Sequence, residues 1–246
     1  MSGEQVRYLT FGDRGLVVEF ENEISPEISM KVRSLYYAVT NSCIPGIISM
    51  IPTYRSLLLE YSPDIIRYKE LLSNLKELEN QFGTIKLPNP NIFLIPTFYG
   101  GEFGPDIQTV MEKNKLSEEE VVSIHSGTDY LVYMLGFAPG FTYLGGMDNR
   151  IETPRLINPR VKVRSGSVGI AGSQTGIYSI DSPGGWQLIG HTPIKIYDPK
   201  REKPVLHKAG DYMRFKAINR AEYDRISAEV DNNTYQYQIF PAEGSQ

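Results

Sequence analysis

A glycine-rich stretch from Gly136 to Pro193 constrains the fold more than any other part of the chain. It covers under a quarter of the 246 residues yet holds 11 of the 22 glycines, 5 of the 16 prolines and the only tryptophan, Trp186. Glycine costs backbone entropy on folding, so such density predicts turns with positive φ and close backbone approaches between short strands. One interpretation is a β-barrel whose turns need these residues. The polar and aromatic side chains gathered in the same stretch also predict a binding site.

Two arginines in this stretch are candidate anion ligands. Arg155 and Arg160 bracket an extended segment flanked by prolines. A guanidinium group binds a carboxylate or phosphate through two parallel hydrogen bonds, so we expect the pair to bind a substrate carboxylate. The alternative is that these arginines pair with surface acids such as Asp148 and Glu152.

The other candidate ligands are hydroxyl, amide and aromatic side chains. The full set of predicted substrate-binding residues is Tyr143, Arg155, Arg160, Ser167, Gln174, Tyr178, Trp186 and Thr192. Ser167 and the backbone amides from Gly166 to Gly172 are expected to donate to an anion or carbonyl. Gln174 and Tyr178 are expected to orient an amide, and Trp186 to present a flat face at a barrel mouth. Ordinary strand polarity and core packing are the alternatives.

Two histidines are candidates for proton transfer. His191 lies beside a threonine, and His125 ends a predicted helix; imidazole titrates near neutral pH. Both are predicted as catalytic, with a hydrogen-bonded structural role as the alternative. The three histidines, which include His207, lack paired spacing, and the single cysteine, Cys43, excludes a cysteine-based zinc site. We therefore expect no metal on this chain.

The first 90 residues alternate strand and helix patterns. Apolar runs predict strands at 15–20, 46–51, 56–61 and 92–95, with residues 8–11 pairing with the first. Capping residues and helical spacing predict helices over 25–43 and from 62 to about 83. The order strand, helix, strand, strand, helix, strand is that of a ferredoxin-like α/β sandwich. Pro88 and Pro90 predict a domain boundary near residue 90, and the last strand fits either side of it.

Beyond the boundary the pattern becomes mostly β. Short helices are expected from Pro105 and from two capping-box sequences, and short apolar runs follow as YLVYML, SVGIA, IYSI, WQLI, IKIY and YMRFKA. Many short strands separated by glycine and proline are typical of a sandwich or barrel. The predicted organisation is thus an α+β chain with domains at 1–90 and 91–246.

Charge and missing motifs exclude several classes of protein. The net charge of −4, with signs interspersed, argues against nucleic acid as a partner. The absence of an 18-residue apolar window and of a signal-peptide pattern predicts no membrane association and a cytoplasmic location. Neither GxxxxGK[ST] nor GxSxG occurs, which excludes a classical P-loop and disfavours a serine-hydrolase elbow.

The central motifs carry a family resemblance. Six segments resemble the KipI family, also called allophanate hydrolase subunit 1 or the B subunit of 5-oxoprolinase. They are GFAPGFTYLGG, TPRLINPR, GSVGIAGSQTGIY and SPGGWQLIGHTP, together with the earlier PTFYGGEFGPD and EEVVSIHS. The match runs in family order from Gly12 to Asp211. It implies a cyclophilin-like β-barrel after the ferredoxin-like domain, a choice that periodicity alone does not make.

The resemblance also implies a function. It points to a subunit of an ATP-dependent 5-oxoprolinase, which opens the small molecule 5-oxo-L-proline to L-glutamate, with a subunit-2-type (PxpC-like) protein and a PxpA-like subunit as partners. ATP with Mg is expected in the assembled complex, whereas this chain should hold neither metal nor biotin and be inactive alone. Two alternatives stay open: a regulatory inhibitor of a sporulation histidine kinase, and a carboxyltransferase-half protein of urea or allophanate metabolism.

Overall fold

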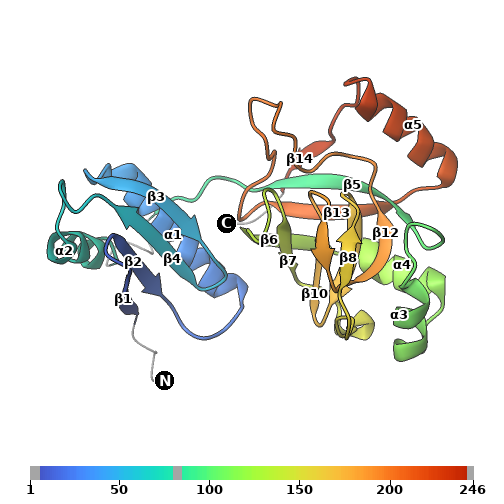
Figure 1. Ribbon diagram of the computed structural model, residues 1–246, viewed down its shortest axis with the longest axis horizontal. Coiled ribbons are helices and arrows are strands. Elements are labelled where there is room, and N and C mark those ends of the chain that lie inside the picture. Colours follow the sequence, from blue (N-terminus) through green and yellow to red (C-terminus); the bar gives the residue numbers. More distant parts are fainter. Residues whose placement is uncertain (1–5, 80–84, 243–246) are drawn as a thin grey trace. The chain divides into compact units, whose positions relative to one another are not determined.

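The structure is a computed structural model that describes residues 6–79 and 85–242. The chain forms two compact units, residues 1–88 and 89–246 (Figure 1). Each unit has a hydrophobic core of its own, built from helices packed on strands.

The N-terminal unit is an antiparallel sheet with two helices. Its strands are β1 (Arg7–Phe11), β2 (Gly15–Glu19), β3 (Ile47–Pro52) and β4 (Ser56–Tyr61), and its helices are α1 (Pro26–Ser42) and α2 (Tyr68–Glu79). The strand order is β1-β2-β4-β3. Alternate residues of the two central strands, including Leu16, Val18, Leu57 and Leu59, are buried in one core with the apolar faces of both helices.

Helix α1 begins and ends where its sequence predicts. The Ser25 side chain accepts a hydrogen bond from the Ile28 amide, and Pro26 occupies the first turn, where its missing N–H costs nothing. The helix ends at Ser42, and its C-cap residue Cys43 has a φ of 48°, in the left-handed region. Local capping chemistry therefore accounts for both ends of this helix.

Helix α2 begins later than predicted. Ser62 and the proline after it start a turn, in which the Ser62 carbonyl accepts the amides of Ile65 and Ile66, and the helix itself starts at Tyr68. The Ile66 side chain is buried in the core of the unit, so the turn serves to place this residue before the helix begins. The predicted end near Gly83 lies outside the described residues.

The strand predicted at 92–95 does not join the N-terminal sheet. It is part of β5 (Asn91–Tyr99), which pairs with three strands of the C-terminal unit. Strand β1 instead pairs with β2, at the sheet edge where the last strand of a ferredoxin-like sheet lies. The unit therefore keeps the ferredoxin-like order with an N-terminal strand in the last position.

The C-terminal unit is built on a closed barrel of seven strands (Figure 1). They are β5, β6 (Asp129–Leu135), β7 (Thr142–Gly145), β9 (Ser167–Ala171), β10 (Gln174–Ile177), β12 (Gln187–His191) and β13 (Tyr212–Ala217). Their order is β12-β9-β10-β7-β6-β13-β5, and β12 pairs with β5 to close the ring. Strands β5 and β13 run parallel. Outside the ring, β14 (Ile239–Pro241) pairs with β5, and β8 (Arg160–Val163) pairs with β11 (Ser182–Gly184).

Helices complete the core of this unit. They are α3 (Ile107–Asn114), α4 (Glu118–Ser126), the 3₁₀ helix η2 (Asn149–Ile151) and α5 (Arg220–Asp231). Both predicted capping boxes form, at the starts of α4 and α5. Inward-facing barrel residues such as Leu144 and Ile170 share one core with Val121 of α4 and Ile226 of α5.

This architecture confirms the predicted fold class, a ferredoxin-like α/β sandwich and a cyclophilin-like β-barrel. Two of the predicted strands are wrong. Of the run IYSI only Ile177 belongs to a strand, the last residue of β10, although the Tyr178 amide still donates across the strands to the Ser167 carbonyl of β9. In the run IKIY, only Tyr197 forms a bridge, to Val205, and no ladder follows from it.

That the two units are separable domains stays a prediction, and limited proteolysis tests it. Residues 85–90 lie in an irregular segment in which Lys86, Pro88 and Asn89 are exposed. We expect the first cut there, leaving a folded C-terminal fragment, because exposed irregular backbone fits a protease active site. A first cut inside the barrel, or loss of both cores after one cut at 85–90, would contradict this division.

Candidate functional site

The glycine-rich stretch forms strands whose outer surface carries four aromatic side chains. Phe141, Tyr178 and Trp186 are buried together, and Tyr143 packs against them. The ring centroids of Phe141 and Trp186 lie 5.6 Å apart, and those of Tyr178 and Trp186 lie 6.3 Å apart, both edge to face. These four residues, here called the aromatic cluster, include three of the predicted ligands.

Two glycines make room for the indole ring. Gly176 faces away from the barrel core, because its neighbours Thr175 and Ile177 point into it. A Cβ at Gly176 would come within 3.0 Å of the Trp186 ring, and a Cβ at Gly169 within 3.1 Å of the Trp186 side chain. Glycine at these two positions therefore leaves room for the Trp186 side chain to pack closely against the outside of the barrel wall.

Arg155 is an exposed cation beside the aromatic cluster. The next residue, Leu156, donates its amide to the Gly185 carbonyl over 2.7 Å, which holds this segment against the turn before Trp186. Burial raises the pKa of Tyr143 and that of Tyr178, and the nearby Arg155 charge opposes part of each rise. Arg155 has no hydrogen bond or ion pair with another described residue, so its guanidinium group is free to bind an anion.

Arg160, in contrast, is already paired. Its guanidinium group lies 2.6 Å from the Asp106 carboxylate and donates to the Trp186 carbonyl over 3.4 Å. Asp106 is buried and also accepts the Leu188 amide at 2.6 Å. The two side chains thus tie the loop before α3 to β8 and β12. We interpret Arg160 as a structural residue, and the partner is neither of the acids expected from the sequence.

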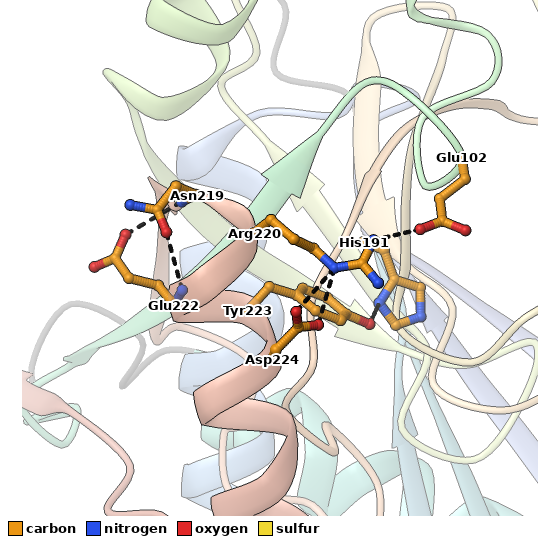
Figure 2. Close-up of polar contacts among 7 residues, drawn as sticks. All are labelled: Glu102, His191, Asn219, Arg220, Glu222, Tyr223 and Asp224. Carbon is orange, nitrogen blue, oxygen red and sulfur yellow. Dashed lines mark hydrogen bonds and ion pairs between the residues drawn. The ribbon is translucent and has the colours of Figure 1, made fainter.

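His191, the last residue of β12, is hydrogen-bonded through both ring nitrogens, and Figure 2 shows its bond to Tyr223 of α5. Its Nε2 lies 2.8 Å from the Ser165 carbonyl, and its Nδ1 lies 2.9 Å from the Tyr223 hydroxyl. A carbonyl can only accept, so Nε2 carries the proton and Nδ1 accepts from Tyr223. Burial lowers the pKa of His191 to about 4. The neutral ring therefore fastens α5 to the barrel.

Further contacts reinforce this attachment. Phe103 stacks on the Tyr223 ring at 4.6 Å, and Arg220 forms ion pairs with Glu102 and Asp224 (Figure 2). A proton transfer from His191 to a ligand would have to break one of its two hydrogen bonds. The geometry favours the structural alternative, and the catalytic role stays a prediction.

His125 is placed in the barrel core, apart from the aromatic cluster. Its Nδ1 lies 2.7 Å from the Tyr99 hydroxyl, and its Nε2 lies 2.8 Å from the Thr175 hydroxyl. Thr175 donates to the Gly169 carbonyl, so it accepts from His125 Nε2, and Nδ1 accepts from Tyr99. Burial lowers the pKa of His125 to about 3. Its two nitrogens satisfy interior hydroxyls, which leaves neither for a ligand.

The backbone amides predicted to bind an anion are not available. The amides of Gly166, Ser167 and Gly172 donate to the carbonyls of Tyr178, Arg164 and Thr153. The interpretation of this loop as an anion-binding nest is therefore wrong, since its donors are used in the barrel wall. Ser167 itself is buried in β9 opposite His191 of β12 and belongs to that wall.

The two remaining predicted ligands lie in different places. Gln174 is two residues before Gly176 on β10, so it shares the outer face of the barrel with Tyr143, which lies opposite Gly176. Thr192 is buried, and its hydroxyl accepts the Ile194 amide at 3.4 Å. The structure thus gathers Tyr143, Arg155, Gln174, Tyr178 and Trp186 on one outer face. It leaves Ser167, Thr192, His125 and His191 in the barrel wall and core, and Arg160 on β8, paired with Asp106.

The sequence analysis missed Phe137. Its ring is 69% exposed although it lies 5.5 Å from the Phe141 ring, and its φ is 64°. A bulky residue seldom adopts this left-handed conformation, which costs energy that the surrounding structure must supply. The signal in the sequence was the phenylalanine between Gly136 and Ala138, which no helix or strand pattern explains.

Metal ligands and membrane spans are both absent from the described part of the chain. No group of three or more His, Cys, Asp or Glu side chains there is placed to hold a metal ion. None of the helices within those residues is long and apolar enough to cross a bilayer.

The buried histidines predict how stability depends on pH. The pKa of His191 is lowered to about 4, and those of His125 and His207 to about 3, by burial, whereas imidazole in the unfolded chain titrates near 6.5. Below pH 6.5 the unfolded state therefore binds protons that the folded state does not. The free energy of unfolding consequently falls as the pH is lowered from 6.5. Each histidine contributes about 1.4 kcal/mol per pH unit to that slope.

Thermal denaturation between pH 4 and pH 8 checks this expectation. The midpoint should be constant above pH 7 and fall between pH 6.5 and 4. A His191→Gln variant, whose amide can still donate to Ser165 and accept from Tyr223, should show a shallower slope. Equal slopes for the two proteins would mean that His191 is not neutral when buried.

Comparisons with known proteins now identify the family. The family described as "Carboxyltransferase domain, subdomain C and D" matches residues 6–207. The chain belongs to this family. It is 41% identical to the B subunit of 5-oxoprolinase from Bacillus subtilis over 229 residues, covering 89% of this chain and 95% of that protein. It is 36% identical to the B subunit of 5-oxoprolinase from Escherichia coli O157:H7, covering 86% and 96%.

A solved structure and a more distant relative extend the comparison. The crystal structure of TTHA0988 superposes with a TM-score of 0.76 at 36% identity over 84% of this chain, which spans only 40% of that longer protein. The urea amidolyase of Saccharomyces cerevisiae is 27% identical over 96% of this chain and 14% of its own. Relatives of this chain therefore occur both as proteins of its own length and as parts of longer ones.

Proposed function

We propose that this chain is the B subunit of an ATP-dependent 5-oxoprolinase. The observation that carries the proposal is its 41% identity to the B subunit of 5-oxoprolinase from Bacillus subtilis over nearly the full length of both proteins. The partners in this proposal are a subunit-2-type (PxpC-like) protein and a PxpA-like subunit. A carboxyltransferase half in urea metabolism is the second candidate, which the similarity to yeast urea amidolyase favours.

The aromatic cluster and Arg155 supply a place for the substrate in this proposal. 5-Oxoproline carries a carboxylate on a five-membered lactam ring. The free guanidinium group of Arg155 suits the carboxylate, and the half-buried ring of Tyr143 offers an apolar face to the lactam. The half-buried Gln174 shares that face of the barrel and suits the lactam amide. In this scheme the chain binds and orients the substrate.

ATP with Mg belongs to the assembled complex in this proposal. Ring opening adds water across the lactam C–N bond, and phosphorylation of the lactam oxygen by ATP first makes that carbon electrophilic. The chain contains no GxxxxGK[ST] sequence to cradle a triphosphate. A partner subunit, or a site shared with one, is therefore proposed to hold the nucleotide.

The isolated chain is accordingly expected to hydrolyse neither ATP nor 5-oxoproline. Glutamate formation and phosphate release should appear only when the purified chain is mixed with both partner proteins. Robust ATP-dependent turnover by the single chain would overturn the assignment. Transfer of a carboxyl group from carboxybiotin by the mixture, without glutamate formation, would favour the second candidate.

A further inference from the structure

Three large apolar side chains next to the aromatic cluster are turned toward solvent. Phe137 is 69% exposed, Ile157 is 96% exposed and Val161 is 90% exposed. A single exposed apolar residue is ordinary, but several gathered on one part of a surface mark an interaction site. The three residues are here called the apolar rim.

Each residue of the apolar rim is held close to the aromatic cluster by its own contact or by a near neighbour in the chain. Phe137 contacts Phe141 and precedes Ala138, which packs on the cluster, and Val161 lies two residues before Val163, which is buried in it. Ile157 follows the residue whose amide is bonded to Gly185, directly before Trp186. The rim therefore borders the surface that carries Arg155.

The backbone holds these side chains outward. Strand β8, which carries Val161, is paired with β11 through Val163 opposite Ser182. The left-handed backbone at Phe137, with φ of 64°, costs energy that an ordinary loop would avoid by placing glycine there. The backbone conformation therefore keeps the side chains of the apolar rim exposed. Removal of these side chains from water by a partner would stabilise a complex.

The segment that carries Ile157 and Val161 is also positively charged. Residues 155–164 contain four cationic side chains and no acidic one. Arg160 pairs with Asp106 and Lys162 pairs with Asp181. Arg155 and Arg164 are exposed and form no ion pair with any residue in the described ranges. A complementary surface would carry an apolar centre with carboxylates around it.

We propose that the apolar rim docks the subunit-2-type partner protein of the enzyme proposed above, on which this inference rests. A second copy of this chain fits less well, because a two-fold contact through the rim would set the unpaired guanidinium groups of each copy against those of the other. Docking beside Arg155 also lets the partner cover the aromatic cluster and enclose a substrate bound there.

Binding of the purified partner protein to variants of this chain tests the proposal. Ile157→Asp and Val161→Asp should each weaken the complex about ten- to thirtyfold by calorimetry or sedimentation, since each buries a carboxylate at the contact. Arg164→Glu should slow association, most strongly at low salt. Ile48→Asp is the matched control: Ile48 is 57% exposed on β3 of the other unit, and its variant should bind normally.

Each outcome decides between the surfaces. Normal binding by both rim variants, with Ile48→Asp equally normal and wild-type mixtures active, overturns this inference while the proposed function stands. Binding that the rim variants weaken, in mixtures without 5-oxoprolinase activity, keeps the inference and overturns the function. Absence of binding by wild-type protein, or a homodimer that the rim variants dissolve, overturns the choice of occupant.

Discussion

The Arg155→Lys variant is expected to reduce kcat/KM for 5-oxoproline in the assembled enzyme by about ten- to hundredfold. Lysine keeps the positive charge but lacks the planar fork that binds a carboxylate through two hydrogen bonds, and a charged hydrogen bond contributes about 1.5–3 kcal/mol. The side chain is exposed and unpaired among the described residues, so its replacement should leave the barrel intact. Steady-state kinetics with saturating ATP measure the effect.

Arg150→Lys is the matched control for this loss. Arg150 is also exposed, in the same unit, and forms a bidentate pair with Asp148 at 2.7–3.1 Å. Its replacement should change kcat/KM little, because a solvent-exposed ion pair contributes little to stability. If Arg155→Lys assembles normally with the partners and retains wild-type kcat/KM, Arg155 does not bind the substrate carboxylate.

The largest loss of stability is expected for Asp106→Ala. The Asp106 carboxylate accepts from Arg160 and from the Leu188 amide, both at 2.6 Å, and is only 8% exposed. Removal of this carboxylate leaves the buried Leu188 amide without its acceptor, and it also leaves the Arg160 side chain, which is 29% exposed, without its ion-pair partner. We expect the free energy of unfolding to fall by about 2–4 kcal/mol, or the melting midpoint by roughly 4–16 °C.

A surface ion pair of the same unit is the control for Asp106. Asp129 pairs with Arg214, with exposed side-chain fractions of 35% and 47%. Asp129→Ala should change the free energy of unfolding by about 1 kcal/mol or less. Equal melting midpoints for Asp106→Ala and wild type would show that the Arg160–Asp106 pair is not needed to hold β8 and β12 together, and would reopen a ligand-binding role for Arg160.

Local chemistry predicted the elements whose ends depend on neighbouring residues. The caps of α1, α4 and α5 form as their sequences indicate, because a cap is made by residues three or four positions apart. The pairing of strands, in contrast, depends on residues far apart in the chain. Nothing within β5 says that it pairs with β13, more than 110 residues later, rather than with the sheet before it, since both choices bury the same apolar run.

The candidate site was predicted in part for the same reason. The glycine density pointed to Trp186 and the tyrosines, because close packing on a barrel wall requires small residues beneath a large ring. The role of Arg160 depends on Asp106, 54 residues earlier, and no local pattern joins them. His125 looked like a helix-terminal polar residue, and only the closed barrel shows that its imidazole lies between Tyr99 and Thr175.

Omission of this chain from a reconstituted mixture tests the central claim most directly. Glutamate and ADP should form together when the chain, the subunit-2-type protein, the PxpA-like subunit, ATP with Mg and 5-oxoproline are all present. Leaving out this chain alone should abolish both products, and adding it back should restore them. Glutamate formation at an unchanged rate in its absence would contradict the assignment of this chain as a subunit of the enzyme.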